Sequence, residues 1–184
     1  MSQTSTYLTK DIYIPQVDEQ DQFIAPVERW KAHREGILHR AFTVAVYYDG
    51  KIICQHRKHP VFDKVFDLTA SSHPQVIDGS IQSMEEAVFA TLAREWGMKK
   101  TDVQLLKNVG FALYDDKDPN SEYREHEYCY LLTCETTRLP IVNTEVAYGY
   151  SLVSKEELND PVKRAVYQFA PWVHAFLAKG LLTR

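Results

Sequence analysis

The 184-residue chain contains only three cysteines, Cys54, Cys129 and Cys134, and no two of them form a Cys-x-x-Cys pair. An odd number of thiols without this spacing favours reduced cysteines over a disulfide framework, so we expect a cytoplasmic protein. The chain also lacks a run of about 20 apolar residues, the length that a membrane-spanning helix requires. Its first residues contain no apolar stretch of signal-peptide length. We therefore expect no membrane partner.

An excess of positive charge is absent as well, because the formal net charge is −4. Proteins that bind nucleic acid or anionic membranes usually carry a basic surface, so we expect neither partner. This balance still allows a local basic pocket for a small phosphorylated molecule. With 45% hydrophobic and 25% charged residues, the chain has the composition of one globular domain with a sizeable core. We expect a monomer or a homodimer.

The strongest secondary-structure signals lie in the first half of the chain. Residues 41–48 are β-branched, aromatic and almost continuously apolar, which predicts a strand buried on both faces. Asp49-Gly50 is typical of a two-residue hairpin turn, and residues 51–57 then form the return strand. Ser83-Met-Glu-Glu86 fits a capping box and predicts a helix that runs to Trp96 and ends at Gly97.

Weaker patterns complete an α+β fold with a mixed sheet, because strand signals are interrupted by helix signals. The acidic stretch between Val17 and Ile24 predicts an early hairpin turn. Further strands are expected at residues 11–15 (an edge strand), 65–68, 105–114, 123–134 and 145–153, and further helices at 26–34, 155–158 and 169–182.

Five side chains of the kinds that bind metals form the main candidate site. Glu125 and Glu127 are two residues apart on a predicted strand, so both carboxylates point to the same face. Neighbouring like charges are unfavourable unless a cation lies between them. Together with His33, His39 and His73, these two carboxylates suit a transition-metal ion such as Mn²⁺ or Zn²⁺. The alternative is that the two glutamates lie on a solvated strand face and the histidines in loops.

Glu95 is a second unusual carboxylate. It lies three residues after Leu92 on the apolar side of the predicted helix, where an unpaired charge is unfavourable. Its oxygens suit a harder ion such as Mg²⁺. The alternative is an ion pair with Arg94 or Arg57.

Four segments, at residues 33–42, 72–75, 125–129 and 169–172, resemble in this order type 1 isopentenyl-diphosphate isomerase, a branch of the Nudix superfamily. The similarity extends over about residues 16–175. It implies an α/β/α sandwich around a mixed sheet, formed by a Nudix domain at 16–184 after an N-terminal extension at 1–15. The implied reaction converts isopentenyl diphosphate to dimethylallyl diphosphate by adding a proton at one carbon and removing one at another.

The resemblance also implies roles for individual residues. The metal ligands would be His33, His39, His73, Glu125 and Glu127. Glu127 would in addition be the acid/base group, and Glu95 would bind the Mg²⁺ that bridges the diphosphate. Tyr114 would support Glu127, and Trp172 would face the cationic centre of the reaction. An indole face favours a nearby cation, although a core tryptophan is an equally simple interpretation of Trp172.

The chain departs from the family pattern at the catalytic cysteine, which is replaced by Ser71. A serine hydroxyl is a far poorer acid or base near neutral pH than a thiol, so Ser71 is expected to orient substrate or to relay a proton through water. Cys129 shares the predicted strand face of Glu127 and is an alternative thiol, or else a buried structural one.

The expected diphosphate-binding cations are also fewer than in the family. Arg29, Arg57 and Lys58 are the predicted set, with His59 as the alternative to Lys58. The helix arginine of the family falls on Thr91. Fewer cations imply weaker diphosphate binding or a ligand with a different head group.

Three functions therefore remain open. The first is a metal-dependent isomerase that moves protons at the alkene of a prenyl diphosphate or related substrate, with protonation-initiated cyclisation as a variant. The second is a Nudix hydrolase, although only Glu95 of the three glutamates in the Nudix box is present. The third is a catalytically silent protein that binds a prenyl ligand.

Overall fold

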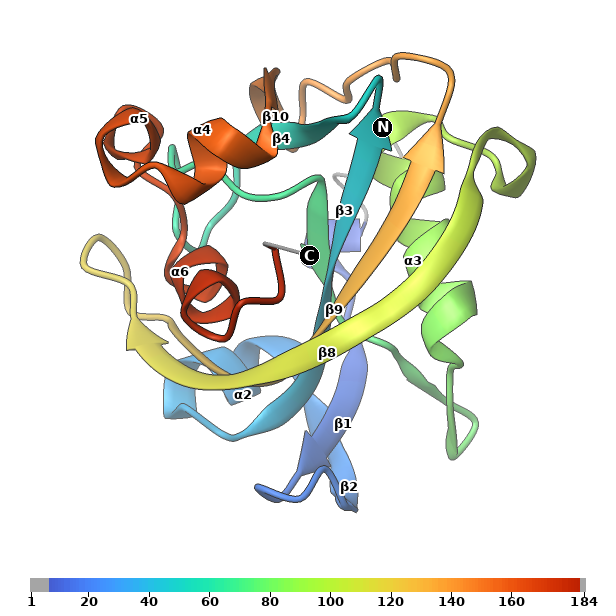
Figure 1. Cartoon of the computed structure of the whole chain (residues 1–184). Coiled ribbons are helices and arrows are strands. Elements are labelled where there is room, and N and C mark those ends of the chain that lie inside the picture. The colour runs from blue at the N-terminus through green and yellow to red at the C-terminus, as the bar shows by residue number, and fades with distance from the viewer. Residues whose placement is uncertain (1–6, 183–184) are drawn as a thin grey trace.

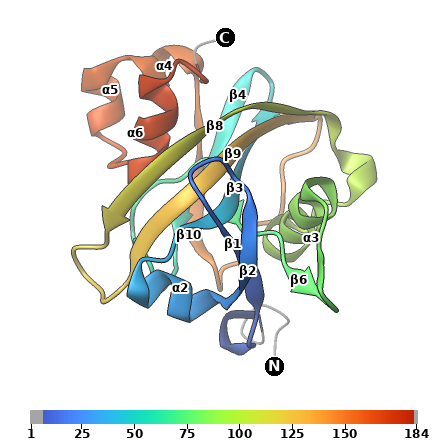
Figure 2. The same ribbon diagram turned by 90° about the horizontal axis from the view of Figure 1, so that it is seen from below.

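The computed structural model describes residues 7–182 and shows a mixed sheet with helices on both sides (Figure 1). Helix α3 (Met84–Trp96) covers one face. Helices α4 (Lys155–Asn159), α5 (Pro161–Ala165) and α6 (Pro171–Ala178) lie on the other side, and the view from below separates the same two groups (Figure 2). This arrangement confirms the predicted α+β fold with a mixed sheet.

The centre of the sheet is a parallel pair of long strands, β3 (His39–Tyr48) and β9 (Arg124–Thr136). β3 is almost entirely buried, as its continuous apolar sequence predicts, because helices cover both faces. β4 (Lys51–Arg57) returns beside β3 after the predicted Asp49-Gly50 turn, in which both residues have positive φ, 48° and 71°.

The remaining elements extend this centre. The described residues form an eight-stranded sheet in which the order β10-β4-β3-β1-β2 is joined by β5 and β9 beside β3, and by β8 beside β9. The strand bounds are β1 (Tyr13–Val17), β2 (Phe23–Glu28), β5 (Ala70–Ser72), β8 (Gln104–Lys117) and β10 (Ala147–Val153). A separate hairpin pairs β6 (Val76–Ile77) with β7 (Ser80–Ile81), and α2 (Arg29–Glu35) and a 3-10 turn (Lys100–Asp102) complete the chain.

The predicted ends of α3 are confirmed. The Ser83 side chain accepts a hydrogen bond from the Glu86 backbone and the Glu86 side chain returns one, which is the expected capping box. Gly97 ends the helix with a φ of 60°, a conformation that favours glycine. The buried side of α3, which includes Leu92 and Trp96, packs on the β3 side chains Phe42 and Val44.

Two predictions for the first 40 residues are wrong. The strand predicted as an edge at 11–15 is β1, which lies between β2 and β3. The helix predicted at 26–34 begins only at Arg29, because Glu28 ends β2 and its carboxylate caps the backbone of Trp30 and Lys31. The domain boundary predicted after residue 15 falls inside β1 and remains a prediction.

Several further boundaries differ from the prediction. The strand predicted at 65–68 is an irregular segment in which Phe66 forms isolated bridges with His56 and Phe169, and the strand follows at Ala70–Ser72. β8 continues to Lys117, three residues past the predicted end. The last helix ends at Ala178 rather than at 182. Local sequence patterns do not contain the long-range pairing that sets the ends of these strands and helices.

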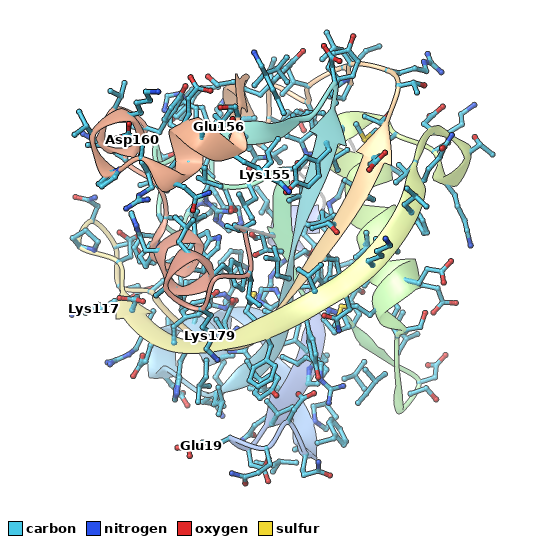
Figure 3. The ribbon with its side chains drawn as sticks, viewed as in Figure 1. Glu19, Lys117, Lys155, Glu156, Asp160 and Lys179 are labelled. Atoms are coloured by element: carbon cyan, nitrogen blue, oxygen red, sulfur yellow. The ribbon has the colours of Figure 1, made fainter. Side chains whose placement is uncertain are left out.

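Two large apolar cores lie on opposite faces of the sheet, and a smaller one joins β1, β2 and α2. One of the large cores packs α6 and the β3–β4 strands around Leu131 and Phe176, and the other packs α3 on the opposite face. Charged side chains such as Glu19, Lys117 and Glu156 project from the periphery (Figure 3). Within residues 7–182, no helix is long and apolar enough to cross a membrane.

Candidate metal centre and adjoining cavity

Five side chains from separate elements converge at the start of the β3–β9 pair. Their ligand atoms all lie within 4.8 Å of one another, and the residues are His33, His39, His73, Glu125 and Glu127. His33 comes from α2, His39 begins β3, and His73 directly follows β5. Glu127 faces His39 across the parallel ladder, and Glu125 lies two residues earlier on the same face of β9. The structure thus brings together the set that the sequence predicts.

Backbone carbonyls hold two of the imidazoles in place. His33 Nδ1 lies 2.7 Å from the carbonyl oxygen of Arg29, and His39 Nδ1 lies 2.7 Å from that of Ile37. A ring that donates from Nδ1 keeps the lone pair on Nε2, which is the arrangement of metal-binding histidines. The Nε2 atoms of His33 and His39 lie 3.2 Å from Glu125 Oε2 and 3.5 Å from Glu127 Oε1.

Unsatisfied atoms in this cluster fit a cation. His39 Nε2 and Glu125 Oε2 are buried, yet neither has a hydrogen-bond partner among the described residues. Buried polar atoms are normally paired, so two such atoms in one cluster need an explanation. A divalent ion among three imidazoles and two carboxylates would satisfy both. The donor set therefore fits a transition ion.

Burial and neighbouring charges shift the pKa values of the cluster in different directions: those of Glu125 and His33 are raised, whereas those of Glu127 and His73 are lowered. Burial raises the pKa of Glu125, and the nearby Glu127 carboxylate raises it further. Burial also acts to raise the pKa of Glu127, but the nearby imidazoles of His39 and His73 outweigh this effect and hold it well below its usual range. Burial lowers the pKa of His73 to about 3. An ionised Glu127 and a neutral His73 are the forms that bind metals.

Tyr114 lies opposite Glu127 in the antiparallel β8–β9 ladder. Its hydroxyl group donates a hydrogen bond to Glu127 Oε2. Burial raises the pKa of Tyr114 well above 10, so the phenol stays protonated and remains a donor. The Trp172 ring stacks on the Tyr114 ring with centroids 6.3 Å apart. Glu127, Tyr114 and Trp172 therefore form one continuous wall.

A buried carboxylate that the sequence analysis missed holds Trp172 in this wall. Asp67 is fully buried and accepts a hydrogen bond of 2.7 Å from Trp172 Nε1 and one of 2.9 Å from Arg57 Nη1. Arg57 also donates to the carbonyl oxygens of Val61 and Phe62, and its Cζ lies 5.0 Å from the Trp172 ring centre. Asp67 carried no sequence signal, because its partners lie 10 and 105 residues away.

Ser71 lies at the cavity wall on β5, beside a second hydroxyl group. Its Oγ is 2.8 Å from Thr43 Oγ1, which in turn lies 3.6 Å from Cys129 Sγ. Cys129 is fully buried, and burial raises the pKa of its thiol well above 9. It does not line the cavity, whereas Ser71 does. The arrangement favours a structural thiol over a replacement for the missing cysteine.

The metal cluster opens into a cavity of about 40 Å³, which has room for a few water molecules. Its walls carry most of the predicted site residues: His33, His73, Glu125, Glu127, Glu95, Ser71, Tyr114, Trp172, Arg29 and Arg57. Unpredicted wall residues include Tyr7, Leu8 and Trp30, and His59, the alternative to Lys58, also contributes. Lys58 lies outside this wall, where its Nζ donates to the carbonyl oxygen of Thr144.

Glu95 lines the cavity but is not one of the five clustered ligands. Its Oε1 accepts a 2.9 Å hydrogen bond from Arg94 Nη2, and its Oε2 lies 3.5 Å from Gln55 Nε2. The pairing with Arg94, which the sequence left open, is therefore present. Glu95 still presents a carboxylate to the same cavity as the cluster.

No protein-family model matches the chain. An isopentenyl-diphosphate Delta-isomerase from Aliivibrio fischeri is 28% identical over 176 residues, which cover 92% of this chain and 94% of that protein.

Solved structures resemble the fold. The crystal structure of DR0079 from Deinococcus radiodurans aligns with a TM-score of 0.66 at 16% identity and covers 92% of this chain and 98% of that one. The Nudix hydrolase RenU from M. smegmatis aligns with a TM-score of 0.50 at 11% identity, covering 92% of each chain. The chain therefore has the fold of Nudix hydrolases and is similar in sequence to isopentenyl-diphosphate Delta-isomerases.

Proposed function

We propose that this protein is a metal-dependent enzyme that moves protons at the alkene of a prenyl diphosphate, as an isopentenyl-diphosphate isomerase does. The observation that carries the proposal is the shared wall of the cavity. Four of the five clustered ligands (all except His39), the Tyr114–Glu127 hydrogen bond and the indole of Trp172 meet there. The sequence similarity to isopentenyl-diphosphate Delta-isomerases supports the same reaction.

His33, His39, His73, Glu125 and Glu127 would hold an Mn²⁺ or Zn²⁺ ion, and Glu95 would bind a Mg²⁺ ion that accompanies the diphosphate. The first ion would supply positive charge that stabilises ionised Glu127, and the second would neutralise phosphate oxygens.

Glu127 is assigned the proton transfer at one carbon of the alkene. Tyr114 donates to its Oε2, and so orients the carboxylate and opposes its protonation in the resting site. Trp172 is held by Asp67 and presents its ring beside Tyr114, where an indole face stabilises a developing carbocation. Burial of this wall limits the water that could reach and trap the cation.

Ser71 is assigned to the second proton transfer, through a water molecule. Its hydroxyl group lines the cavity and is oriented by Thr43. Because a serine hydroxyl titrates far above neutral pH, it would pass a proton rather than hold a charge. We therefore expect slower isomerisation than a thiol at this position would give.

Hydrolysis is the second function under consideration, because the fold is that of Nudix hydrolases and Glu95 reaches the cavity. It would require the metal cluster to activate water towards a diphosphate. The absence of two of the three Nudix-box glutamates ranks it below the isomerase.

One incubation separates these functions. Purified protein is mixed with Mn²⁺, Mg²⁺ and isopentenyl diphosphate in D₂O and followed by ¹H and ³¹P NMR. Deuterium in the carbon chain together with dimethylallyl diphosphate supports the isomerase, whereas released phosphate supports the hydrolase. An unchanged spectrum with bound ligand would favour a silent prenyl-binding protein and contradict both.

A further inference from the structure

Two of the three cations predicted to hold the diphosphate are engaged elsewhere. The Arg57 guanidinium forms an ion pair of 2.9 Å with buried Asp67 and donates to two backbone carbonyls. Lys58 is exposed, and its Nζ donates to the carbonyl oxygen of Thr144 at 3.0 Å. A diphosphate bound in this cavity could use Arg57 or Lys58 only by breaking these contacts.

Arg29 is a buried cation without an anionic partner. It is only 3% exposed and lines the cavity, yet no carboxylate within residues 7–182 forms an ion pair with it. Its Nη2 donates to the carbonyl oxygens of Tyr7 and Leu8, whereas its Nε is buried without a partner among the described residues. A buried charge is unfavourable unless it is matched. This guanidinium is therefore arranged to receive an anion.

Arg94, in the last turn of α3, has the same unsatisfied atom. Its Nε is buried and has no hydrogen-bond partner in the described part of the chain. Its Nη2 donates to Thr91 Oγ1 at 3.2 Å and to Glu95 Oε1 at 2.9 Å. Residues three apart on a helix lie on neighbouring turns of one face. The Arg94 guanidinium therefore lies beside Thr91, the position at which the resemblance leads one to expect an arginine.

One aromatic ring brings the two guanidinium groups together. The ring centre of Tyr7 lies 4.8 Å from Arg29 Cζ and 3.7 Å from Arg94 Cζ, and Tyr7 itself lines the cavity. A ring face attracts a cation but accepts no hydrogen bond of the strength that a phosphate oxygen does. With a volume of about 40 Å³, the cavity admits a prenyl diphosphate only if part of its wall moves.

We propose that Arg29 and Arg94 form an anion-binding site for the diphosphate group of the substrate, and that the ring of Tyr7 covers this site until the ligand displaces it. The nature of the ligand rests on the proposed function, whereas the binding of the anion can be measured without turnover. The site would replace Arg57 and Lys58 as the principal protein contact of the head group.

The test is calorimetric titration of the protein with inorganic diphosphate in excess Mg²⁺. Arg29→Gln and Arg94→Gln should each raise Kd about tenfold or more, because each removes a charge-assisted hydrogen bond. Tyr7→Ala should lower Kd because it uncovers both groups, and Tyr7→Phe should bind like the parent protein. Lys31→Gln is the matched control, since it removes an exposed charge from the same helix as Arg29.

Unchanged binding by Arg94→Gln would overturn the two-arginine site, and weaker binding by Tyr7→Ala would overturn the covering role of Tyr7. Circular dichroism of each variant checks folding. If Arg29→Gln fails to fold, the Arg94 and Tyr7 variants still decide the question, because both positions are less buried. Isomerisation is assayed separately. The predicted binding pattern without any turnover would contradict the proposed function and leave the anion site supported.

Discussion

The Tyr114 hydroxyl group donates a hydrogen bond to Glu127 Oε2 from the directly opposite position of the β8–β9 ladder. The other oxygen of the same carboxylate, Oε1, lies 3.0 Å from His73 Nε2. Glu127 is thus shared between a phenol and the metal-type cluster. Its orientation is fixed by the backbone of two paired strands rather than by a loop, which suits a group that must hold its geometry during proton transfer.

Tyr114→Phe removes this hydrogen bond and retains the ring against Trp172. We expect the isomerisation rate to fall about 10- to 100-fold, because a hydrogen bond to a charged group contributes about 1.5–3 kcal/mol. Deuterium incorporation measured by ¹H NMR provides the readout. Tyr148→Phe, at an exposed tyrosine, is the control. An equal rate for Tyr114→Phe and the parent protein would remove Tyr114 from the mechanism.

Metal removal should destabilise the folded protein. At a free Mn²⁺ concentration of 100 times Kd, binding stabilises the native state by about 2.7 kcal/mol, which raises Tm by about 5–10 °C in a chain of this size. EDTA should abolish this increase, as should His39→Gln, which removes a ligand of the cluster. His174→Gln, at an exposed histidine of α6, should keep it. The same thermal shift in His39→Gln would contradict the metal centre.

Ser71→Cys should raise the isomerisation rate about tenfold or more, since a thiol is a much better proton donor and acceptor near neutral pH. Cys129→Ser should leave the rate unchanged, because Cys129 Sγ lies behind Thr43 and outside the cavity wall. Initial rates of dimethylallyl diphosphate formation measure both. A rate lost in Cys129→Ser would identify Cys129, rather than Ser71, as the group that works with Glu127.

Asp67→Asn leaves the Arg57 guanidinium buried without a counter-ion. Breaking a buried ion pair costs about 3–5 kcal/mol, so the midpoint of urea unfolding should fall sharply. Glu35→Gln, which breaks the exposed pair of Lys31 with Glu35, should have a much smaller effect. Similar midpoints for the two variants would show that Asp67 is not a structural partner of Arg57 and Trp172.

The sequence predicts the metal-type cluster well, because strand alternation places Glu125 and Glu127 on one face and the resemblance selects the histidines. It does not predict the parallel pairing that puts His39 opposite Glu127, since residues 88 apart meet there. Local signals located the capping box of α3 and the Asp49-Gly50 turn correctly. They failed at residues 65–68, where backbone hydrogen bonds to distant segments replace regular strand pairing.

The predicted cations show a second limit. Arg57 was expected at the ligand, but a carboxylate ten residues later pairs with it. Tyr7 was not predicted at the site, and Arg94 was considered only as a partner of Glu95, because the Tyr7–Arg94 contact joins the beginning of the described chain to the end of α3. Charge type is visible in a sequence, whereas the partner that uses the charge depends on the folded structure.

The positions of the side chains in the site depend on the register of the parallel β3–β9 pair. Side chains alternate across a strand, so sliding β9 by a single residue would turn Glu125 and Glu127 away from the three histidines and carry His126 inward. The fold could tolerate such a slip only by repacking both faces of β9, because most of its side chains are buried or half-buried. Any insertion between Asp118 and Arg124 should therefore be absorbed by the loop, and the chemistry of the cavity is protected by the same apolar packing that stabilises the sheet.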